Sequence, residues 1–133
     1  MTVDKIGKSD KDWRQELTPE RYRVLRQHGT EPPGSSPLNY EKGPGEFLCA
    51  GCGAELFQSG TKYESGSGWP SFYAPMPNAV ETSSDTGHGM TRTEVHCARC
   101  GGHLGHVFPD GPEPTGERYC INGAALDFKP QGQ

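Results

Sequence analysis

Two cysteine pairs with the same spacing constrain the fold of this chain more than any other feature of its sequence. Cys49 and Cys52 form the first pair and Cys97 and Cys100 the second, with 44 residues between the pairs and a glycine after each. Zinc takes four ligands in a tetrahedron, and two residues between cysteines allow both sulfurs of one tight turn to reach the same ion. Glycine helps such a turn to adopt a positive φ. The pairs therefore predict one structural Zn²⁺ site that holds two distant segments together.

Other uses of these residues stay open. The thiols could be buried without a metal, or Cys97 and Cys100 could form a redox dithiol, but neither reading explains why the spacing occurs twice. His103 and His106 continue the three-residue rhythm after Cys100 and could compete as metal ligands. A closed four-thiolate site has no open position for a substrate, so any catalysis must be found elsewhere in the chain.

Composition favours one small domain with many loops. Hydrophobic residues make up 31% of the 133-residue chain, which also holds 19 glycines and 12 prolines. A chain of this length forms one domain with a modest core, and a structural metal would help to fix it. We expect residues 10–129 to form that domain, residues 1–9 to be a disordered or extended tail, and residues 130–133 to fray.

Charge and hydropathy exclude several partners. The formal net charge is −4, and Lys and Arg form no basic run, so neither nucleic acid nor an anionic membrane is expected as a partner. No segment is long and apolar enough for a signal peptide or a membrane span. We expect a soluble, cytoplasmic monomer, and in a reducing compartment cysteine pairs are more often metal ligands or redox groups than disulfides.

The pattern of apolar residues predicts a mainly β body after two short helices. Residues 10–29 are helical in pattern, with Thr18 as an N-cap, Pro19 as a first helical residue and Gly29 as a stop. Residues 30–45 are expected to cross the surface as an extended polar connector. Short apolar runs cut by turn residues then predict antiparallel strands. The expected strands are Glu46–Leu48, Ala54–Phe57, Ser71–Tyr73, Val80–Ser83, Met90–His96, Leu104–Phe108, Arg118–Ile121 and Ala125–Phe128.

The fifth cysteine, Cys120, is the candidate nucleophile. If residues 118–122 form a strand, its two-residue period puts Arg118, Cys120 and Asn122 on one face. An arginine stabilises a nearby thiolate, and an amide can donate hydrogen bonds to a sulfur or oxygen with developing charge. Free cysteine is also among the most buried residue types, so a core role for Cys120 is an equal alternative.

Other candidate groups lie in two further strings. His103, His106 and Asp110 follow closely after the second cysteine pair. Histidine is the usual general acid at neutral pH, and a carboxylate such as that of Asp110 could orient an imidazole. Trp69 and Phe72 could line an apolar pocket, although a core role is the commoner use of such aromatic residues.

Taken together, these strings resemble methionine sulfoxide reductase B, the enzyme family that reduces the R-sulfoxide of peptidyl methionine. The resemblance runs from about Trp13 to Phe128, and the two cysteine pairs match the zinc-binding form of the family. It implies two antiparallel sheets in the β-tent, or Mss4-like, arrangement with short N-terminal helices. The strings that carry it are Leu17-Thr-Pro-Glu-Arg-Tyr, Gly-Thr30-Glu31, Tyr63-Glu-Ser-Gly, Gly68-Trp-Pro-Ser-Phe, His88-Gly-Met-Thr-Arg, Gly-Gly-His103-Leu-Gly-His106-Val-Phe and Arg118-Tyr-Cys-Ile-Asn122.

The resemblance also implies roles for single residues. Cys120 would be the nucleophile, and Trp69 would hold the S-methyl group of the substrate with Phe108 as a second substrate-binding residue. The polar groups around the thiol would be Arg118, Asn122, His103, His106 and Asp110.

Sulfoxide chemistry suits this set. The sulfur of a sulfoxide is electrophilic only when its oxygen is protonated or strongly hydrogen bonded, so the site must supply a thiolate and an acid together. Cys120 would attack the sulfur, the oxygen would pass to the cysteine, and methionine would leave behind a sulfenic acid. A second thiol must then reduce that acid.

The chain departs from a common family pattern at Ser67. Many members have a resolving cysteine in the string Gly-Cys-Gly-Trp-Pro, at the place that Ser67 takes here. Because the other four cysteines are assigned to zinc, either thioredoxin or another external thiol regenerates Cys120, or Ser67 is an engineered substitution that traps the cycle.

Three alternatives belong to other classes. The strongest is a non-enzymatic, zinc-bound module that binds partner proteins; a nucleic-acid-binding zinc ribbon and a dithiol oxidoreductase fit less well. An accessible thiol of low pKa at Cys120 would favour the enzyme, since a binding module has no need of one.

Overall fold

The computed structural model describes residues 10–27, 29–32, 34, 36–41, 43–63, 65–85 and 92–131. The expected tail 1–9 and the end of the chain at 132–133 lie outside the described residues. So does the segment 86–91, which holds the first residues of the expected strand Met90–His96 and most of the string that begins at His88.

The described residues form two helices and nine strands, and they confirm the mainly β prediction. The helices are α1 (Asp10–Glu16) and α2 (Pro19–Gln27). The strands are β1 (Gly45–Cys49), β2 (Glu55–Gln58), β3 (Lys62–Tyr63), β4 (Ser71–Phe72), β5 (Val80–Asp85), β6 (Arg92–Cys97), β7 (His103–Phe108), β8 (Arg118–Ile121) and β9 (Leu126–Pro130). Each of the eight expected strands overlaps one of these. The ninth, β3, was not predicted, because two residues are too few to show the two-residue period of a strand.

The second helix, α2, begins and ends where the sequence indicates. The amide of Arg21 donates to the hydroxyl of Thr18 over 3.2 Å, which makes Thr18 the N-cap of α2. At the other end, the amide of Gly29 donates to the carbonyl of Arg23 over 2.9 Å. These bonds satisfy backbone groups that have no partner within the helix.

The connector after α2 differs from the extended surface segment that we expect. Pro37–Tyr40 forms a 3-10 turn, η1, which Ser36 caps by accepting the amide of Leu38 over 3.1 Å. Glu31 is only 2% exposed. The prediction is wrong in part: Glu31 and Ser36 are buried and Pro37–Tyr40 is not extended, whereas Pro32, Pro37 and Tyr40 are exposed, as expected of a surface segment.

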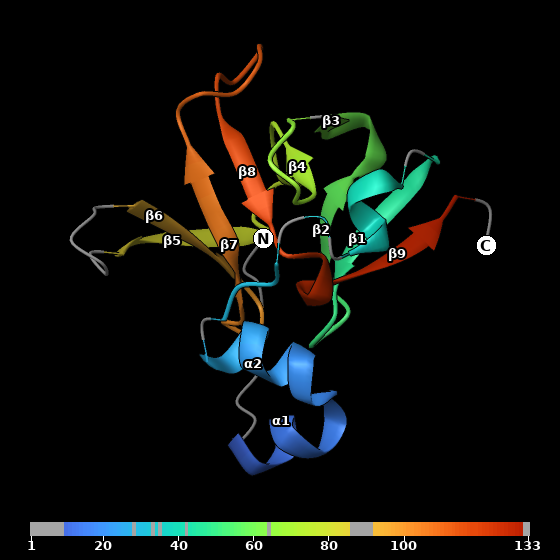
Figure 1. The fold of residues 1–133 in the computed structure, drawn as a ribbon, viewed down its shortest axis with the longest axis vertical. Helices are drawn as coiled ribbons and strands as arrows, with labels where there is room; N and C mark the ends of the chain where they lie inside the picture. Colours follow the sequence, from blue (N-terminus) through green and yellow to red (C-terminus); the bar gives the residue numbers. More distant parts are fainter. Residues whose placement is uncertain are drawn as a thin grey trace.

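The strands form two antiparallel sheets (Figure 1). The smaller sheet has the order β2-β1-β9, and the larger has the order β3-β4-β8-β7-β6-β5. Three buried phenylalanines join them: Phe57 on β2 stacks on Phe72 of β4 with ring centroids 4.3 Å apart, and Phe47 on β1 meets Phe72 edge-on at 5.1 Å. Phe72 is therefore a core residue at the junction of the sheets and does not line a pocket.

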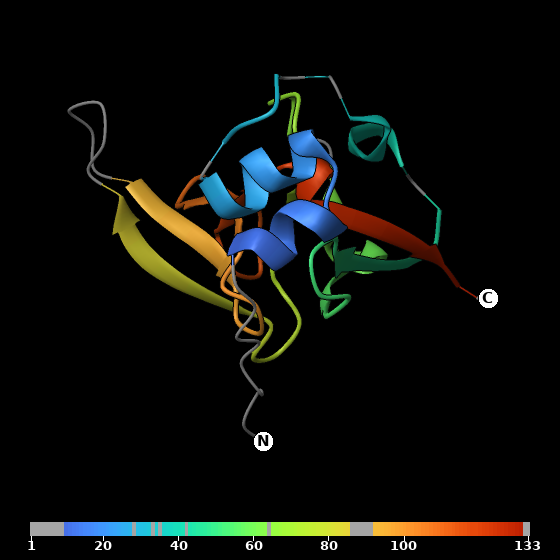
Figure 2. The ribbon, with the colours of Figure 1, turned by 90° about the horizontal axis from the view of Figure 1, so that it is seen from below.

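Both helices lie at one end of the molecule (Figure 1), and the view onto that end shows them in front of the sheets (Figure 2). The guanidinium of Arg26 on α2 donates to the carbonyl of Cys100 over 2.9 Å and lies over the ring of Trp13, 4.7 Å from its centroid. A Cβ at Gly102 would lie 3.0 Å from Leu25, so glycine allows α2 to approach the second cysteine turn closely. No helix among the described residues is long and apolar enough to cross a membrane.

Candidate metal centre and candidate active site

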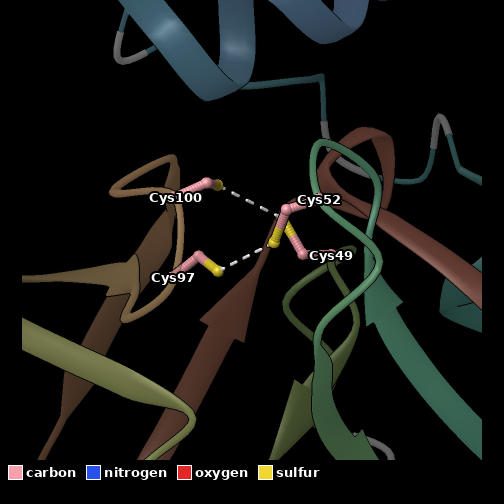
Figure 3. Close-up of side chains that lie close together, drawn as sticks. All are labelled: Cys49, Cys52, Cys97 and Cys100. Atoms are coloured by element: carbon pink, nitrogen blue, oxygen red, sulfur yellow. Dashed lines mark hydrogen bonds between the residues drawn. The ribbon is translucent and has the colours of Figure 1, made fainter. Parts of the chain in front are cut away.

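The four paired cysteines meet in one cluster (Figure 3). The Sγ atoms of Cys49 and Cys100 lie 3.7 Å apart, and those of Cys52 and Cys97 lie 3.6 Å apart. A tetrahedral ion with metal–sulfur bonds of about 2.3 Å would have sulfur atoms about 3.8 Å apart. The cluster therefore has the donor set and the spacing of a four-thiolate metal site.

Each cysteine pair is the turn of a hairpin, and the two hairpins belong to different sheets. Gly53 and Gly101 have φ of 78° and 75°, which confirms the predicted positive φ. Their amides donate to the carbonyls of Cys49 and Cys97, both over 2.8 Å. A metal at this point would join the β1–β2 turn to the β6–β7 turn, and with them the two sheets.

Neither candidate histidine competes for this position. Among the described residues the cluster consists of cysteines alone. His103 instead directs Nδ1 to the carboxylate of Glu94, 2.6 Å away, and His106 lines the cavity described below. The alternative of a mixed cysteine and histidine site is therefore wrong.

The register of the larger sheet places Cys120 between a histidine and a serine. Cys120 on β8 is the direct partner of His106 on β7 and of Ser71 on β4. Directly paired residues of antiparallel strands share a face of the sheet. Gly105 allows this close pairing, because a Cβ there would collide with the carbonyl of Cys120.

A bulge in β7 brings His103 to the same face as His106. Residues three apart on a regular strand point to opposite faces. Between β6 and β7, however, Val95 pairs with Gly105 while His96 pairs with His103, so β7 has an additional residue at this point. Bulges of this kind re-aim side chains. The ring centroids of the two candidate histidines are consequently only 5.5 Å apart.

The thiol of Cys120 faces a cavity of about 320 Å³. The lining residues that the sequence indicates are Cys120, Ser67, Trp69, His106, Phe108, Arg118 and Asn122. His103 and Asp110 do not line it. Thr30, Arg92 and Gly105 also line the cavity, although no role was assigned to them. Thr30 and Arg92 lie in strings that carry the family resemblance, but nothing local in the sequence indicates that they approach Cys120.

The pKa of Cys120 does not follow the expectation of a low value. Burial raises the pKa of this thiol, and it outweighs the opposing effects of the Ser67 hydroxyl, 3.9 Å away, and of the Arg118 guanidinium. The arginine is less effective because Asp110 neutralises part of its charge. In the substrate-free protein Cys120 therefore keeps its proton at neutral pH.

Asp110 is paired with Arg118 and does not orient a histidine through its carboxylate. Arg118 donates from Nε to Oδ1 over 2.9 Å and from Nη2 to Oδ2 over 3.2 Å. This ion pair holds the pKa of the Asp110 carboxyl below its usual range. The guanidinium also lies over the ring of Phe108, 4.5 Å from its centroid. Asp110 thus positions one wall of the cavity through Arg118.

A second set of hydrogen bonds joins Asn122 and Trp69, which line the cavity, through Glu31. The amide side chain of Asn122 donates to the carbonyl of Leu104 and accepts from the amide of Glu31, each over 3.0 Å. The carbonyl of Glu31 accepts the indole N–H of Trp69 over 2.9 Å, and its carboxylate accepts the amide of Ala124 over 2.7 Å. Glu31 was missed because an isolated acid in a polar connector carries no periodic signal of burial.

Ser67 belongs to a cluster of hydroxyl groups beside the thiol. The hydroxyl of Ser65 lies 2.8 Å from that of Ser67 and 2.6 Å from that of Ser71. Ser67 Oγ in turn lies 3.9 Å from Cys120 Sγ. The position that many family members give to a resolving cysteine therefore adjoins the candidate nucleophile.

Comparison with solved structures supports the fold. The "Yippee-like" domain of Mis18 superposes with a TM-score of 0.55 at 18% sequence identity, over 68% of this chain and 99% of that one. At this identity the similarity shows the fold alone. Fold and cluster together define a mainly β domain of two antiparallel sheets whose hairpin turns meet in a four-cysteine site.

Comparison of sequences identifies the family within this class. The SelR domain model matches residues 17–130. Proteins named peptide methionine sulfoxide reductase MsrB are 59% identical over 125 residues in Leptospira interrogans, covering 93% of this chain and 95% of that one, and 61% identical over 130 residues in Leifsonia xyli, covering 96% and 94%. One from Methanosarcina mazei is 57% identical over 129 residues, covering 96% and 92%. The chain belongs to the SelR domain family, among the MsrB proteins.

Proposed function

We propose that this chain reduces the R epimer of methionine sulfoxide in peptides or proteins to methionine, with Cys120 as the nucleophile. One observation carries the proposal: the thiol of Cys120 faces a cavity that is lined by two aromatic residues, Trp69 and Phe108, and by the imidazole of His106, which is paired directly with Cys120 across the sheet. The membership of the MsrB family supports the same reaction.

The substrate would enter with its methyl group against Trp69 and its oxygen toward His106. An indole whose N–H is already bonded to Glu31 is held in one orientation and offers its apolar face to the methyl group. His106 is the better candidate for the acid because it lines the cavity, whereas His103 is 2% exposed and bonded to Glu94.

The raised pKa of Cys120 does not supply the low-pKa thiol that would favour an enzyme over a binding module, so the proposed reaction needs help with proton transfer. The thiol loses its proton as its sulfur attacks the sulfoxide sulfur, and the sulfoxide oxygen needs a proton at the same stage. His106 is placed to pass it, and general acid–base help of this kind contributes about 10²–10⁴-fold. The protonated oxygen leaves the substrate sulfur as water while a sulfur–sulfur bond joins that atom to Cys120. Water then attacks the Cys120 sulfur, the sulfur–sulfur bond breaks and methionine leaves. Cys120 is left as a sulfenic acid, so the sulfoxide is reduced and the thiol oxidised by two electrons.

We propose that an external dithiol, thioredoxin or a related reductant, regenerates Cys120. Its first thiol forms a mixed disulfide with Cys120 and releases water, and its second thiol reduces that disulfide. Support comes from the cysteine count, because the four others meet in the metal cluster and Ser67 supplies no thiol. The protein would act in a reducing compartment, since both the cluster and this cycle need reduced cysteines.

We also propose that the cluster holds a structural Zn²⁺ on Cys49, Cys52, Cys97 and Cys100. When bound, the ion would cross-link the two hairpin turns and take no part in the reaction, because a closed four-thiolate site has no open position. Residues 10–129 would then fold as one domain around the phenylalanine core shared by both sheets.

The test is to incubate the zinc-loaded protein with a peptide that carries both epimers of methionine sulfoxide and excess dithiothreitol. Each epimer is followed by chromatography, beside a Cys120→Ser control. Loss of the R epimer alone, abolished in the control, would support the reaction and its nucleophile. No loss of either epimer from the folded, metal-loaded protein would overturn the proposal in favour of a zinc-bound interaction module.

A further inference from the structure

We propose that Glu94, His96 and His103 form a second binding site, for a divalent transition-metal ion, separate from the four-cysteine cluster. Their potential ligand atoms all lie within 4.8 Å of one another. The Oε2 atom of Glu94 is 2.6 Å from Nδ1 of His103 and 3.0 Å from Nε2 of His96. Two imidazoles and one carboxylate therefore converge on a single point.

The fold places these groups together by the same bulge that shapes the active site. Glu94 and His96 are two residues apart on β6, so they share a face. His103 would face away from them in a regular register, but the bulge makes it the direct partner of His96. The convergence of the three side chains is thus a property of the strand pairing and not of one mobile rotamer.

The donor set suits zinc, cobalt or copper and leaves a ligand position open. Two histidines and a glutamate are a three-protein-ligand set found in zinc sites that keep a fourth position for water, and imidazole suits zinc, copper and nickel. Tetrahedral ligands at about 2.0–2.1 Å from an ion lie about 3.3–3.4 Å apart. His96 is close to that spacing from Glu94 already, and His103 needs only a small outward shift.

The burial of the three side chains describes how an ion would reach them. The side chains of His103 and Glu94 are 2% and 10% exposed, whereas that of His96 is 25% exposed. An ion would enter at His96, where the hydroxyl of Ser83 on β5 lies 3.4 Å from Nε2. The buried carboxylate then supplies the negative charge that a cation needs in such a place.

The same contacts also fit a plain hydrogen-bonded trio, in which one carboxylate accepts from both imidazoles. Only a binding measurement separates the two arrangements, and it requires no catalytic activity.

If the proposed function holds, an ion at this site would also slow the reductase, because it would lie close to the candidate acid. The centroid of the His103 ring lies 5.5 Å from that of His106, and Glu94 is the direct partner of His106 across the sheet.

The experiment starts from protein that carries one equivalent of Zn²⁺ in the cysteine cluster, confirmed by elemental analysis, and adds Co²⁺. We expect a second equivalent to bind and to produce visible cobalt bands without the sulfur-to-metal charge-transfer bands that thiolate ligands cause. His96→Asn should weaken this second binding by more than about tenfold, because loss even of outer-shell partners has effects of that size. Glu94→Gln should weaken it similarly, while the first equivalent stays bound.

Glu81→Gln is the matched control, because Glu81 on β5 is the direct partner of His96 but is not one of the converging ligands. That variant should bind cobalt as the wild type does. Absence of a second equivalent in the wild type, or full retention of it in His96→Asn, would overturn the proposal. If His96→Asn failed to fold, the wild type still decides the matter, because paramagnetic Co²⁺ must broaden the ring signals of both His96 and His103.

Discussion

The metal cluster and the cavity wall around Cys120 differ in what brings their residues together. In the cluster, each half is one hairpin turn in which cysteine spacing and a glycine of positive φ define the local geometry. In the cavity wall, Cys120 and His106 come from two strands, β8 and β7, and meet only because of the register between these strands. The geometry of the metal cluster is therefore set within each turn, whereas the geometry around Cys120 is set by the pairing of strands that are distant in the sequence.

The largest effect should follow from breaking the cluster. We expect Cys97→Ser to lose the metal and the cooperative fold, because a structural zinc contributes about 10–16 kcal/mol while a domain is stable by only about 5–15 kcal/mol. Thermal unfolding followed by circular dichroism, with metal content measured in parallel, checks this. Cys120→Ser is the matched control and should melt like the wild type. A metal-free Cys97→Ser protein that unfolds at the same temperature as the wild type would contradict the proposal that the metal in the cluster holds the two sheets together.

The next largest effect should come from the cavity wall. We expect His106→Gln to lower kcat by about 10²–10⁴-fold, because it removes the candidate acid. Stability should change little, because His106 is only half-buried on β7. His103→Gln should lower kcat less, because that ring is buried, is bonded to Glu94 and does not line the cavity. Steady-state kinetics and thermal melts of both variants test the order. A larger loss in His103→Gln at equal stability would assign the acid to His103 instead.

The features that depend on local turns could be predicted from the sequence, and those that depend on strand register could not. The four metal ligands and the two glycine turns were predicted from spacing, since a knuckle is a local motif. The strands other than β3 were predicted from alternation and turn residues. The positions of Trp69 and Cys120 around one cavity came from the family resemblance, and the structure brings them together.

The rest depended on contacts that no local pattern records. The bulge that turns His103 toward His106 comes from the pairing of β6 with β7. The burial of Glu31 comes from its bonds to Asn122 and Ala124, which are distant in the sequence. The raised pKa of Cys120 is the balance of burial against Arg118, and Asp110 alters that balance through an ion pair.

A resolving thiol can be added to the cavity wall by substitution of Ser67. In Ser67→Cys, oxidation by substrate without reductant should give a disulfide between position 67 and Cys120, since the present Oγ lies 3.9 Å from Sγ and the side chains need to close by about 2 Å. The wild type should form no internal disulfide. Peptide mapping by mass spectrometry distinguishes them, with Ser65→Cys as the control. A disulfide from Cys120 to a cluster cysteine in the wild type would contradict the separation of the two regions.

A smaller effect concerns Glu31, which is bonded to Asn122, Trp69 and Ala124 beside the cavity. Burial raises the pKa of its carboxyl above the ordinary 4.5, although the Gly123 and Ala124 amides oppose this. Because the folded pKa is the higher one, the stability that this group contributes is fully present below about pH 4.5 and is lost as the pH rises through the folded pKa. The stability of Glu31→Gln relative to that of the wild type should therefore increase as the pH rises through the folded pKa of Glu31. Denaturant unfolding at several pH values measures the difference; one that does not change with pH would show that Glu31 titrates normally.

The smallest effect that we expect concerns the pKa of Cys120 itself. Its alkylation by iodoacetamide should be slow at neutral pH and should still increase above pH 9, because burial raises the pKa of the thiol above its ordinary 9.0. Ser67→Ala should slow alkylation at neutral pH further, by a factor of about 2–3, since it removes a hydroxyl that favours the thiolate. The pH profile of labelling, with the labelled residue identified by mass spectrometry, tests both statements. Labelling that reaches its plateau below pH 7 would mean that Arg118 outweighs burial, and that the ion pair with Asp110 is weaker in solution than its two bonds indicate.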